Sequence, residues 1–545
     1  MNKQAAQLLE QHFDTAFAAP DGIAKLRELI LTLAMQGKLV EQDPNDPPAS
    51  ELLKEIEAER KRQIKAGGIK KQKALPTIDQ PDTSYVLPES WTWTRLGTIG
   101  NIFNGNSINA REKETKYAGA NGLPYIATKD VGYGLDALDY KNGIYIPESA
   151  EKFKIAHQGA VLICAEGGSA GKKCGITEQD ICFGNKLFAN ELFGGIPSKF
   201  ILYLYLSPIF RESFNVAMTG IIGGVSITKI LELPVPLPPL EEQHRIVARI
   251  DQLMARCDEL ERLRKEREEK RVAVHAAAVR QLLDAPNGSA WEFIQQHFGA
   301  LYTVKENLTE LRKAIIQLAI MGALVKSSAD KSRISGNTIS NANAPFPIPG
   351  HWKWVSLSSI SNKERGITYG IVKMGEEPKI GGVFALRCSD VKFRTLDLNS
   401  VRKVTEEVSQ QYSRTILKGG ELLLNIRGTL GGCAVVPYEI AGYNIAREIA
   451  LIPLSNEADA FYILNVISSP YFTEATTQNL RGIAYKGLNL GILSDFQIPL
   501  PPKEEQLLIV RKVNQLMALC DSLEQQIDST TEKQAALLNA VMAQV

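Results

Sequence analysis

The stretch Pro236–Glu261, PLPPLEEQHRIVARIDQLMARCDELE, occurs twice in this chain of 545 residues. Its second copy, PLPPKEEQLLIVRKVNQLMALCDSLE, spans Pro499–Glu524, and 17 of the 26 aligned positions are identical at a constant offset of 263 residues. In each copy a proline-rich segment stops the preceding structure and opens a helix whose apolar residues recur every three or four positions. The chain is therefore an internal duplication in which each half ends with the same long helix.

The duplication starts well before the first long helix. Leu26–Val40 and Leu311–Val325 share 8 of 15 residues at an offset of 285. Apolar residues in both segments follow a helical spacing, which predicts one helix at 22–36 and another at 307–322. Gly37 stands where the first of these helices is expected to end.

The repeats divide the chain into seven segments. They are an N-terminal helical region at 1–40, a basic linker at 41–86, a first globular module at 87–239, a central helical coiled-coil region at 240–325, a linker at 326–347, a second globular module at 348–502 and a C-terminal coiled-coil helix at 503–545. Between Lys54 and Lys73 the first linker holds eight Lys or Arg residues and three Glu residues, a net charge of +5. This charge predicts a solvated linker or, alternatively, a nonspecific contact with phosphate groups.

The two modules share a framework of short strands and turns. LPESWTWTRLGTI at 87–99 matches IPGHWKWVSLSSI at 348–360, and later in each module an apolar strand, a glycine-rich turn and a returning strand follow one another. This pattern predicts an α+β fold, with two α/β modules separated by an antiparallel pair of long coiled-coil helices and related by a pseudo-two-fold internal duplication. The turns of the two modules differ strongly in sequence, which favours two different ligands on one scaffold.

Heptad spacing continues along both long helices. The apolar positions of this seam are Ile246, Ile250, Leu253, Cys257, Leu260, Ile509, Val513, Leu516, Cys520, Leu523, Ile527, Leu537 and Val541. An apolar stripe of this length needs a cover, so we expect the two long helices to pack on each other, with the helices at 22–36 and 307–322 joining the bundle. A helix from Glu241 to about Asp284 would be about 65 Å long and would act as a rigid spacer between the modules.

Composition and motifs exclude several classes of function. With 44% hydrophobic residues, 23% charged residues and a net charge of +1, the chain has the composition of a globular protein without a bulk preference for anions. The glycine-rich GGSAGKKC differs from a nucleotide-binding loop, because Glu166 and Lys173 stand where that loop requires Gly and Ser or Thr. In DPPA at 46–49, Ala49 replaces the aromatic residue with which amino-methyltransferases stack a flipped base.

Metal, disulfide and membrane signatures do not occur either. Six histidines are scattered, and seven cysteines form no CxxC pair. No apolar run reaches the length of a membrane span. We therefore expect no catalytic residue, no metal, no cofactor in this chain and no membrane partner, with free thiols in a reducing cytoplasm.

The remaining chemistry lies in polar and basic residues of the turns. Arg and Lys pair with guanine or phosphate and Asn pairs with adenine, so such residues at matching turns of both modules predict double-stranded DNA as the ligand. The candidate DNA contacts are Asn104, Asn106, Ser107, Asn109, Arg111, Lys113, Lys116, Lys129, Lys172, Lys173, Asn185 and Lys186 in the first module and Lys363, Arg365, Thr368, Tyr369, Lys373, Arg387, Arg427, Asn444 and Arg447 in the second.

Two diverged modules, each ending in Pro-Leu-Pro-Pro, one variable residue, Glu-Glu-Gln and a long heptad helix, resemble the specificity (S) subunit of type I restriction–modification systems. PESWTWTRLG, PYIATKDV and the glycine-rich turn fit the target-recognition domains of this family. The helical N-terminus resembles the branch that carries an extra N-terminal helical region. The resemblance implies that each module reads one half of a bipartite, asymmetric DNA site and that the helices set the spacer between the halves.

The same resemblance implies the partners. Two methyltransferase (M) subunits would bind the helices, bring S-adenosylmethionine and methylate adenine N6. Two restriction (R) subunits would add translocation and cleavage that depend on ATP and Mg²⁺. Three alternatives stay open: the specificity subunit of a two-subunit type II system, a coiled-coil interaction scaffold with two ligand-binding heads, and a standalone enzyme.

Overall fold

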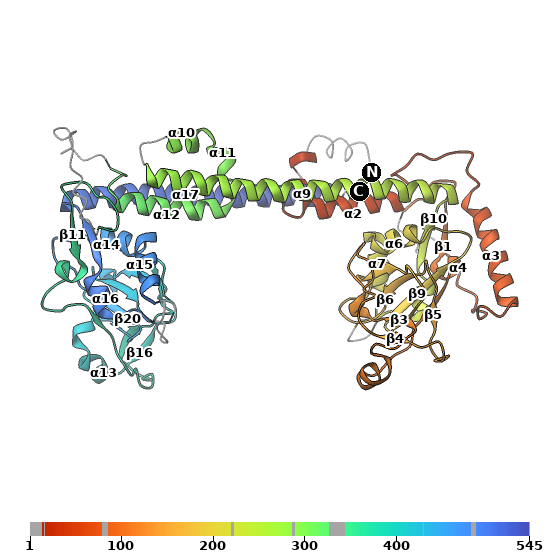
Figure 1. The fold of residues 1–545 in the computed structure, drawn as a ribbon, viewed down its shortest axis with the longest axis horizontal. Helices are drawn as coiled ribbons and strands as arrows, with labels where there is room; N and C mark the ends of the chain where they lie inside the picture. The colour runs from red at the N-terminus through yellow and green to blue at the C-terminus, as the bar shows by residue number, and fades with distance from the viewer. Residues whose placement is uncertain are drawn as a thin grey trace. The chain divides into compact units, whose positions relative to one another are not determined.

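The computed structural model of the protein describes residues 13–15, 17–78, 85–219, 223–285, 289–325, 344–428, 430–480 and 487–543. The chain forms two compact units, Met1–Lys265 with Thr531–Val545 and Glu266–Thr530. Their boundaries fall inside the two long helices, α9 (Leu240–Asp284) and α17 (Lys503–Met542) (Figure 1). Each unit thus contains the start of one long helix and the end of the other, as an antiparallel pair requires.

The expected boundaries of the helices agree with the structure. α9 starts one residue before the predicted Glu241 and ends at the predicted Asp284. Residues 1–12 of the predicted N-terminal region and residues 326–343 of the predicted second linker lie outside the described residues.

Two four-stranded sheets form the centre of the first module. They have the orders β2-β9-β6-β7 and β4-β3-β8-β5, and a separate pair, β1-β10, joins the two ends of the module. The strands are β1 (Thr92–Arg95), β2 (Gly100–Asn104), β3 (Leu123–Ile126), β4 (Tyr145–Ile146), β5 (Ile155–Ala156), β6 (Val161–Cys164), β7 (Cys174–Ile176), β8 (Ile181–Phe183), β9 (Leu187–Leu192) and β10 (Pro234–Leu237). β3 and β8 run parallel, and the other pairs are antiparallel.

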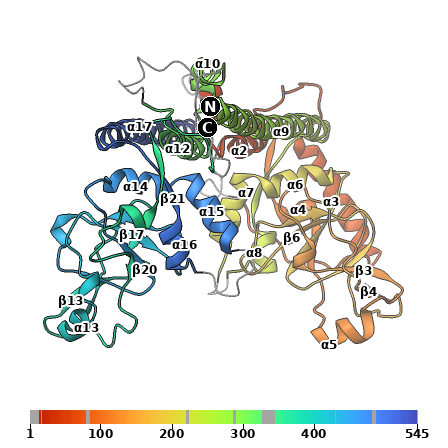
Figure 2. The same cartoon turned by 60° about the vertical axis from the view of Figure 1, so that its left-hand side comes forward.

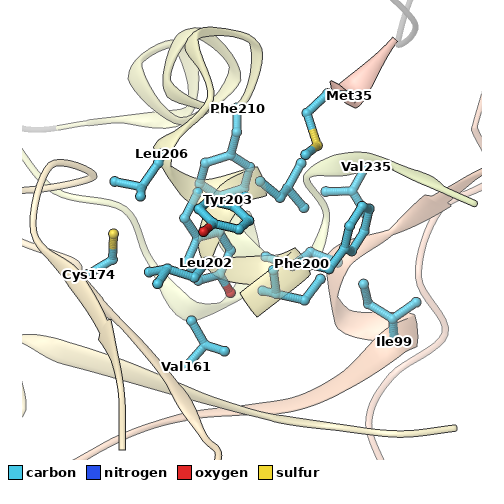
Figure 3. Close-up of a cluster of buried hydrophobic side chains, with 14 of the residues drawn as sticks. Met35, Ile99, Val161, Cys174, Phe200, Leu202, Tyr203, Leu206, Phe210 and Val235 are labelled. Atoms are coloured by element: carbon cyan, nitrogen blue, oxygen red, sulfur yellow. The ribbon is translucent and has the colours of Figure 1, made fainter. Parts of the chain in front are cut away.

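Helices cover one face of the first sheet. They are α2 (Gly22–Met35), α3 (Ala49–Lys65), α4 (Leu96–Ile99), α6 (Ser198–Leu206), α7 (Pro208–Ala217), α8 (Ile227–Leu231) and the start of α9, and shorter turns are α5 (Ala110–Glu112), η2 (Lys113–Tyr117) and η3 (Thr128–Asp130). Because side chains alternate along a strand, Val161 of β6 faces these helices whereas Leu162 faces the second sheet. Figure 3 shows the helical side, where Phe200 and Phe210 gather with Met35 of α2.

A buried glutamine joins the last strand of the first module to the long helix. After β10, Nε2 of Gln243 donates a 2.9 Å hydrogen bond to the carbonyl oxygen of Pro238. Its neighbour Glu242 accepts a 2.9 Å hydrogen bond from Nε1 of Trp91. Both long-helix side chains are buried, so the repeated PLPPxEEQ motif fixes α9 to the β1-β10 pair.

The second module repeats this plan. Its sheets have the orders β12-β20-β17-β18, β16-β13-β19 and β14-β15, and β11 pairs with β21 where the module begins and ends. The strands are β11 (Lys353–Ser356), β12 (Thr368–Tyr369), β13 (Val383–Leu386), β14 (Val391–Lys392), β15 (Thr395–Leu396), β16 (Arg402–Val404), β17 (Leu422–Asn425), β18 (Cys433–Val435), β19 (Asn444–Ile445), β20 (Ile449–Ile452) and β21 (Gln497–Leu500).

Helices also cover one side of the main sheet of the second unit. They are α12 (Lys305–Ile320), α14 (Ala460–Ile467), α15 (Pro470–Leu480), α16 (Leu490–Asp495) and the start of α17. α10 (Ser289–Gln296) and α11 (Phe298–Leu301) pack beside α12 and the end of α9. α13 (Glu406–Gln411) packs instead beside β13 and β16, and the 3₁₀ turns are η5 (Leu357–Ile360), η6 (Ser413–Thr415) and η7 (Tyr438–Ile440). α14 packs on β18 on one side and on α12 on the other, and Figure 2 shows it between the sheet and the long helix.

The glutamine of the second junction makes more hydrogen bonds than that of the first. Nε2 of Gln506 donates to the carbonyl oxygens of Pro501 at 2.9 Å and Glu457 at 3.0 Å. Its Oε1 accepts a 2.7 Å hydrogen bond from the backbone N–H of Asp459. In contrast, Oε1 of Gln243 is buried without a hydrogen-bond partner among the described residues.

One arginine of each short helix bridges two carboxylates of a long helix. Nη2 of Arg27 in α2 lies 2.7 Å from Asp258 and 2.8 Å from Glu261 of α9. Arg312 in α12 makes the same two contacts, at the same distances, with the equivalent acids of α17. The short helix and the start of the long helix are therefore paired identically in both units.

Each long helix buries most of its apolar seam in its own module and short helix. The buried seam residues in these cores are Ile246, Ile250, Cys257, Ile509, Val513 and Cys520, with Leu253 and Leu516 partly buried beside them. Leu260 differs from the prediction, because its side chain is 49% exposed. Heptad spacing identifies an apolar face but not the element that covers it.

The end of each long helix packs in the unit in which the other long helix starts. Ala278 and Leu282, near the end of α9, belong to a cluster that Leu523 and Ile527 of α17 contact. In the first unit, the end of α17 packs on α2 through Leu537 and the buried Leu538, and Val541 of the same helix end is also buried.

The predicted first linker contains a docked helix. α3 is rich in charge, yet its Leu52 and Ile56 lie in the core of the first unit. Because only two large apolar side chains, four positions apart, are buried, the charged sequence does not show that this helix packs on the module. This part of the linker is therefore part of the module's surface.

The cysteines are free thiols, as predicted, and six of the seven are buried. Burial raises the pKa of Cys174 to about 12, so this thiol stays protonated and unreactive. Among the described residues, no group of His, Cys, Asp and Glu side chains is arranged to hold a metal ion. No described helix combines the length and the apolar character that a membrane span needs.

Gln506→Ala should destabilise the protein more than Gln243→Ala. The first substitution removes three hydrogen bonds and leaves the Asp459 N–H unpaired, whereas the second removes one. Each buried group left without a partner costs about 1–3 kcal/mol, so we expect a loss of about 3 kcal/mol for Gln506→Ala and about 1 kcal/mol for Gln243→Ala. Urea unfolding followed by circular dichroism measures both losses, and hydrogen exchange at Asp459 should accelerate only in Gln506→Ala. Equal losses in the two variants would contradict this account.

Candidate nucleic-acid interface

Four strands of the first module end at one edge of its two sheets. Cys164 at the end of β6 pairs with Leu187 at the start of β9, and Asn104 at the end of β2 pairs with the next residue of β9. The parallel strands β3 and β8 end there too, because Ile126 pairs with Phe183. The loops that follow these four strands therefore lie together.

Backbone hydrogen bonds connect the loops at this edge. The N–H of Asn106 donates to the carbonyl of Phe183 at 2.8 Å, and the N–H of Gly184 donates to the carbonyl of Ile126 at 2.9 Å. The loop after β6 is tied in by the N–H of Ala165, which donates to the carbonyl of the residue before β9 at 2.8 Å. The edge thus has a fixed backbone on which side chains can vary.

The structure places the predicted residues of the first module in the loops after these strands. Asn104, Asn106, Ser107, Asn109, Arg111, Lys113 and Lys116 end or follow β2, Lys129 follows β3, Lys172 and Lys173 follow β6, and Asn185 and Lys186 follow β8. Among them Ser107, Lys129, Asn185 and Lys186 are exposed. Within the described part of the chain, their side chains make no hydrogen bond or ion pair, so they are available to a ligand.

Other predicted residues of the first module have internal roles. The side chain of Asn109 caps α5 by accepting a 2.8 Å hydrogen bond from the N–H of Glu112. Oδ1 of Asn106 accepts one of 2.8 Å from the N–H of Lys154. Nζ of Lys173 donates to the carbonyl of Thr128 at 3.1 Å and is half-buried. These side chains hold the loops in place and offer few free groups.

Two further side chains, Lys154 and Tyr125, support the loop after β2 by hydrogen bonds. Lys154 was not among the predicted residues, yet its Nζ donates to the carbonyl and Oδ1 of Asn104 at 2.8 and 2.9 Å. Tyr125 donates a 2.8 Å hydrogen bond to the carbonyl of Asn106, and burial raises the pKa of Tyr125 to about 12. Lys154 directly precedes β5 and Tyr125 lies in β3. Both reach the loop after β2 only because the fold brings these distant strands together, which sequence spacing does not show.

The second module forms the same edge from different residues. Tyr369 ends β12, and Asn425 ends β17 opposite the first residue of β20. The ends of the parallel strands β13 and β19 meet where Leu386 pairs with Ile445. The N–H of Ile371 donates to the carbonyl of Ile445 at 2.8 Å, just as Asn106 does in the first module.

Close approach of the backbone requires glycine at the first of these loops. A Cβ atom on Gly105 would lie 2.0 Å from the carbonyl oxygen of Phe183, and one on Gly370 would lie 1.9 Å from that of Ile445. No side chain fits at either position. Gly105 therefore corresponds to Gly370, so TYGI at 368–371 is the counterpart of FNGN at 103–106.

The loops after the strands of the second module present mainly arginine. Arg387 follows β13, Arg427 follows β17 and Arg447 follows β19, and the last two are exposed. Tyr369 and Lys373 are exposed next to them, and Thr368 is half-buried. Arg387 is held by the carboxylate of Asp390, with the nearest ion-pair distance at 3.3 Å. Guanidinium groups in such positions suit guanine edges and phosphates.

Three predicted residues of the second module do not lie at the exposed edge. Arg365 is half-buried at the opposite end of the sheet, where its Nη1 lies 2.5 Å from Oε1 of the buried Glu421. Lys363 lies in the same loop, which precedes β12. Asn444 is fully buried, and its Oδ1 accepts a 2.6 Å hydrogen bond from Thr415. These three residues therefore lie outside the candidate interface.

Exposed aromatic rings at this edge were missed from the sequence. Tyr133 and Phe393 are each 59% exposed. The backbone of Tyr133 forms an isolated β-bridge with Lys173, and that of Phe393 forms one with Cys433. Nζ of Lys173 lies 5.0 Å from the centre of the Tyr133 ring, within the range of a cation–π contact. An aromatic residue in a predicted turn could have pointed to these two rings, but many exposed aromatic residues have no binding role.

Comparison with known proteins shows which family this chain is similar to. A family model described as a type I restriction modification DNA specificity domain matches the chain twice, at residues 88–269 and 352–533. The chain is 28% identical to the type I restriction enzyme EcoAI specificity subunit of Escherichia coli, over 95% of this chain and 93% of that protein. It is 26% identical, with the same coverages, to the EcoEI specificity subunit of that species. A solved HsdS subunit from Thermoanaerobacter tengcongensis is 17% identical over 84% of this chain and 98% of that one, with a TM-score of 0.43.

Gly105→Ala should loosen the edge of the first module. The added Cβ overlaps the carbonyl of Phe183 and forces apart the hydrogen bond from Asn106, at a cost of about 1–3 kcal/mol. Hydrogen exchange should accelerate at residues 104–108 and 183–186. Gly168→Ala is the matched control in the same edge, because a Cβ there meets nothing within 4 Å. Faster exchange in both variants, or in neither, would contradict the close-approach argument.

Proposed function

Because this chain belongs to the family of type I restriction–modification DNA specificity subunits, we propose that each of its modules reads one half of a bipartite DNA site. The family model matches both modules and the start of each long helix. The edge at which four strands end is the part of each module that presents exposed polar side chains on a fixed backbone. We propose this edge as the surface that contacts bases and phosphates.

The difference between the two edges supports an asymmetric site. At equivalent positions after the strands, Asn185 of the first module is replaced by Arg447, and Glu166 is replaced by Arg427. An amide and a guanidinium group have different hydrogen-bonding patterns, and they favour adenine and guanine respectively. This comparison is the observation that carries the proposal: one backbone geometry is repeated with different reading groups.

The chemistry of the complex belongs to partner proteins in this proposal. Methyltransferase subunits would bind the helices and supply S-adenosylmethionine for methylation of adenine N6, and restriction subunits would supply ATP- and Mg²⁺-dependent cleavage. We propose two copies of each, because two units repeat the same pairing of short and long helices. The chain itself would serve as the non-catalytic recognition subunit in the cytoplasm, where DNA and reduced thiols occur together.

The long helices fit the role of a ruler between half-sites. α9 has 45 residues and runs from the first unit into the second. At 1.5 Å per residue its length is about 67 Å, which exceeds the ~34–36 Å of one DNA turn. We propose that the two long helices set the number of unread base pairs between the halves.

Exchanging one module should change one half-site. Residues 87–235 would be replaced by the matching module of a family relative with a different site, and the chimera expressed with its methyltransferase subunit. Methylome sequencing should show a new first half-site, with the second half-site and the spacer unchanged. Two altered half-sites, or none, would show that the modules do not read independently. If no methylated motif depended on this chain, the result would favour the alternative that the chain is an interaction scaffold.

Arg427→Gln and Arg447→Gln should each weaken binding of the methyltransferase-bound protein to its DNA by about 1–3 kcal/mol. Both guanidinium groups are exposed at the edge of the second module. Lys363→Gln is the control, since it removes an exposed cation from the opposite end of the same sheet. Fluorescence anisotropy should show no weakening for the control and, for the arginine variants, reduced discrimination at the second half-site only. Equal losses for Lys363→Gln would place the DNA elsewhere.

A further inference from the structure

One strongly basic segment of the first unit has no role in the mechanism above. We call α3 and the residues that follow it, 49–78, the basic strap. Eight Lys or Arg residues and three Glu residues lie between Lys54 and Lys73, a net charge of +5. Two of those carboxylates are engaged: Glu57 pairs with Lys61 at 2.6 Å, and Glu59 binds the module. The strap therefore has an excess of cations on the surface.

The helical part of the strap is docked on the first module. The N–H of Ala49 donates a 2.9 Å hydrogen bond to the carbonyl of Ser90. Ile56 is buried against Gly194, and Oε2 of Glu59 accepts a 2.7 Å hydrogen bond from the N–H of Gly194. Figure 1 shows α3 along the flank of this module. A solvated linker would not have such contacts.

The residues after α3 are held along a defined path. Nη2 of Arg60 donates a 2.8 Å hydrogen bond to Oε1 of Gln72, and Ile69 packs on the core of the module. The guanidinium group of Arg95 donates to the carbonyls of Pro76 at 3.2 Å and Thr77 at 2.6 Å. The strap is thus fixed both before and after its run of lysines.

The strap is docked on the same module as the edge that we propose to contact DNA. Lys154, whose Nζ donates to Asn104 at the end of β2, has a pKa lowered by burial and, after it, by the positive charge of Lys70. The charge of Lys70 therefore acts on the lysine that binds the end of β2. Lys70, Lys71 and Lys73 are all exposed. They add positive surface to the first module without adding a base-reading amide.

The docking site of α3 is particular to the first module. Gly194 has φ of +63°, and a Cβ atom there would lie 2.6 Å from Cγ1 of Ile56. At the offset of 262 that relates Ser207 to Ser469, the second module has Asn456 in place of Gly194. The side chain of Asn456 would therefore overlap a helix that packed on the second module in the way that α3 packs on the first.

We propose that the basic strap binds the sugar–phosphate backbone of duplex DNA beside the half-site read by the first module, so that this half is held by an additional nonspecific contact. The inference rests on the proposed function, because it needs DNA at the edge of the same module. Phosphate contacts require only positive charge within reach and fix the position of a protein on DNA without reading its sequence.

The test is the salt dependence of DNA binding by the full chain in complex with its methyltransferase subunit. The triple variant Lys70→Gln, Lys71→Gln and Lys73→Gln should reduce the slope of log K against log salt by about 0.9 for each phosphate that is no longer neutralised, so by about 1–3 in total. Cognate and noncognate duplexes should weaken by the same factor. The methylated motif should stay unchanged, and the footprint should shorten on the side of the first half-site.

Two further variants separate charge from geometry. The triple control Lys363→Gln, Lys418→Gln and Lys503→Gln removes three exposed cations from the second unit away from its edge, and it should leave the slope unchanged. Gly194→Asn keeps the net charge but displaces α3, so it should lower the slope as the lysine variant does.

The outcomes distinguish this inference from the proposed function. An unchanged slope in the strap variant, or an equal change in the control, would overturn the strap while sequence-specific binding remained. A lower slope in the lysine variant but not in Gly194→Asn would overturn the positioned strap. Loss of all sequence-specific retention by the unmodified complex would instead overturn the proposed function itself.

Discussion

A hydrogen bond from a buried glutamine to a proline carbonyl holds each long helix to its module. The proline-rich strand end cannot continue a ladder, since proline has no N–H to donate, and its carbonyl still needs a donor. Gln243 and Gln506 supply that donor at the same distance of 2.9 Å. Because β10 and β21 also pair with the first strand of their modules, the position of each module on its helix follows from this junction. Within each unit, the placement of the proposed DNA-binding edge therefore depends on this junction.

The internal repeats predicted much of the fold. The site was harder to predict, because its residues lie in loops whose lengths differ between the two modules. The repeats gave the ends of α9 within one residue, because helix starts and apolar spacing are local properties. They did not show that Leu260 is half-exposed, since the cover of a helix depends on distant segments. The prediction of the candidate site was less accurate because the loops of the two modules differ in length. The offset between equivalent residues is 265 at Gly105 and Gly370 but 262 at Ser207 and Ser469. Because of this difference, Lys363 and Arg365 were predicted to lie at the edge although they precede β12.

The two edges differ in their side chains but share a supporting hydrogen bond in the backbone. In both modules an aspartate, Asp130 or Asp390, accepts a 2.8 Å hydrogen bond from the N–H of the residue that follows the parallel strand. That residue is Ala127 in the first module and Arg387 in the second. The buried carboxylate maintains the turn, so the side chain it supports is free to differ. At the proposed interface, substitutions at strand ends would change the bound DNA sequence while the core beneath them stays the same.

The position of Leu538 has a consequence for biosynthesis. This residue is fully buried against Phe17 and Leu29, which leave the ribosome more than 500 residues earlier. At 5–20 residues per second, the apolar patch on α2 waits about 25–100 s for its cover. The equivalent helix of the second unit, α12, follows the segment of α9 that contributes Ala278 and Leu282 to its cluster, so part of its cover already exists when it emerges. The first unit is begun first but completed last, and during that interval α2 is the surface that a chaperone would need to protect.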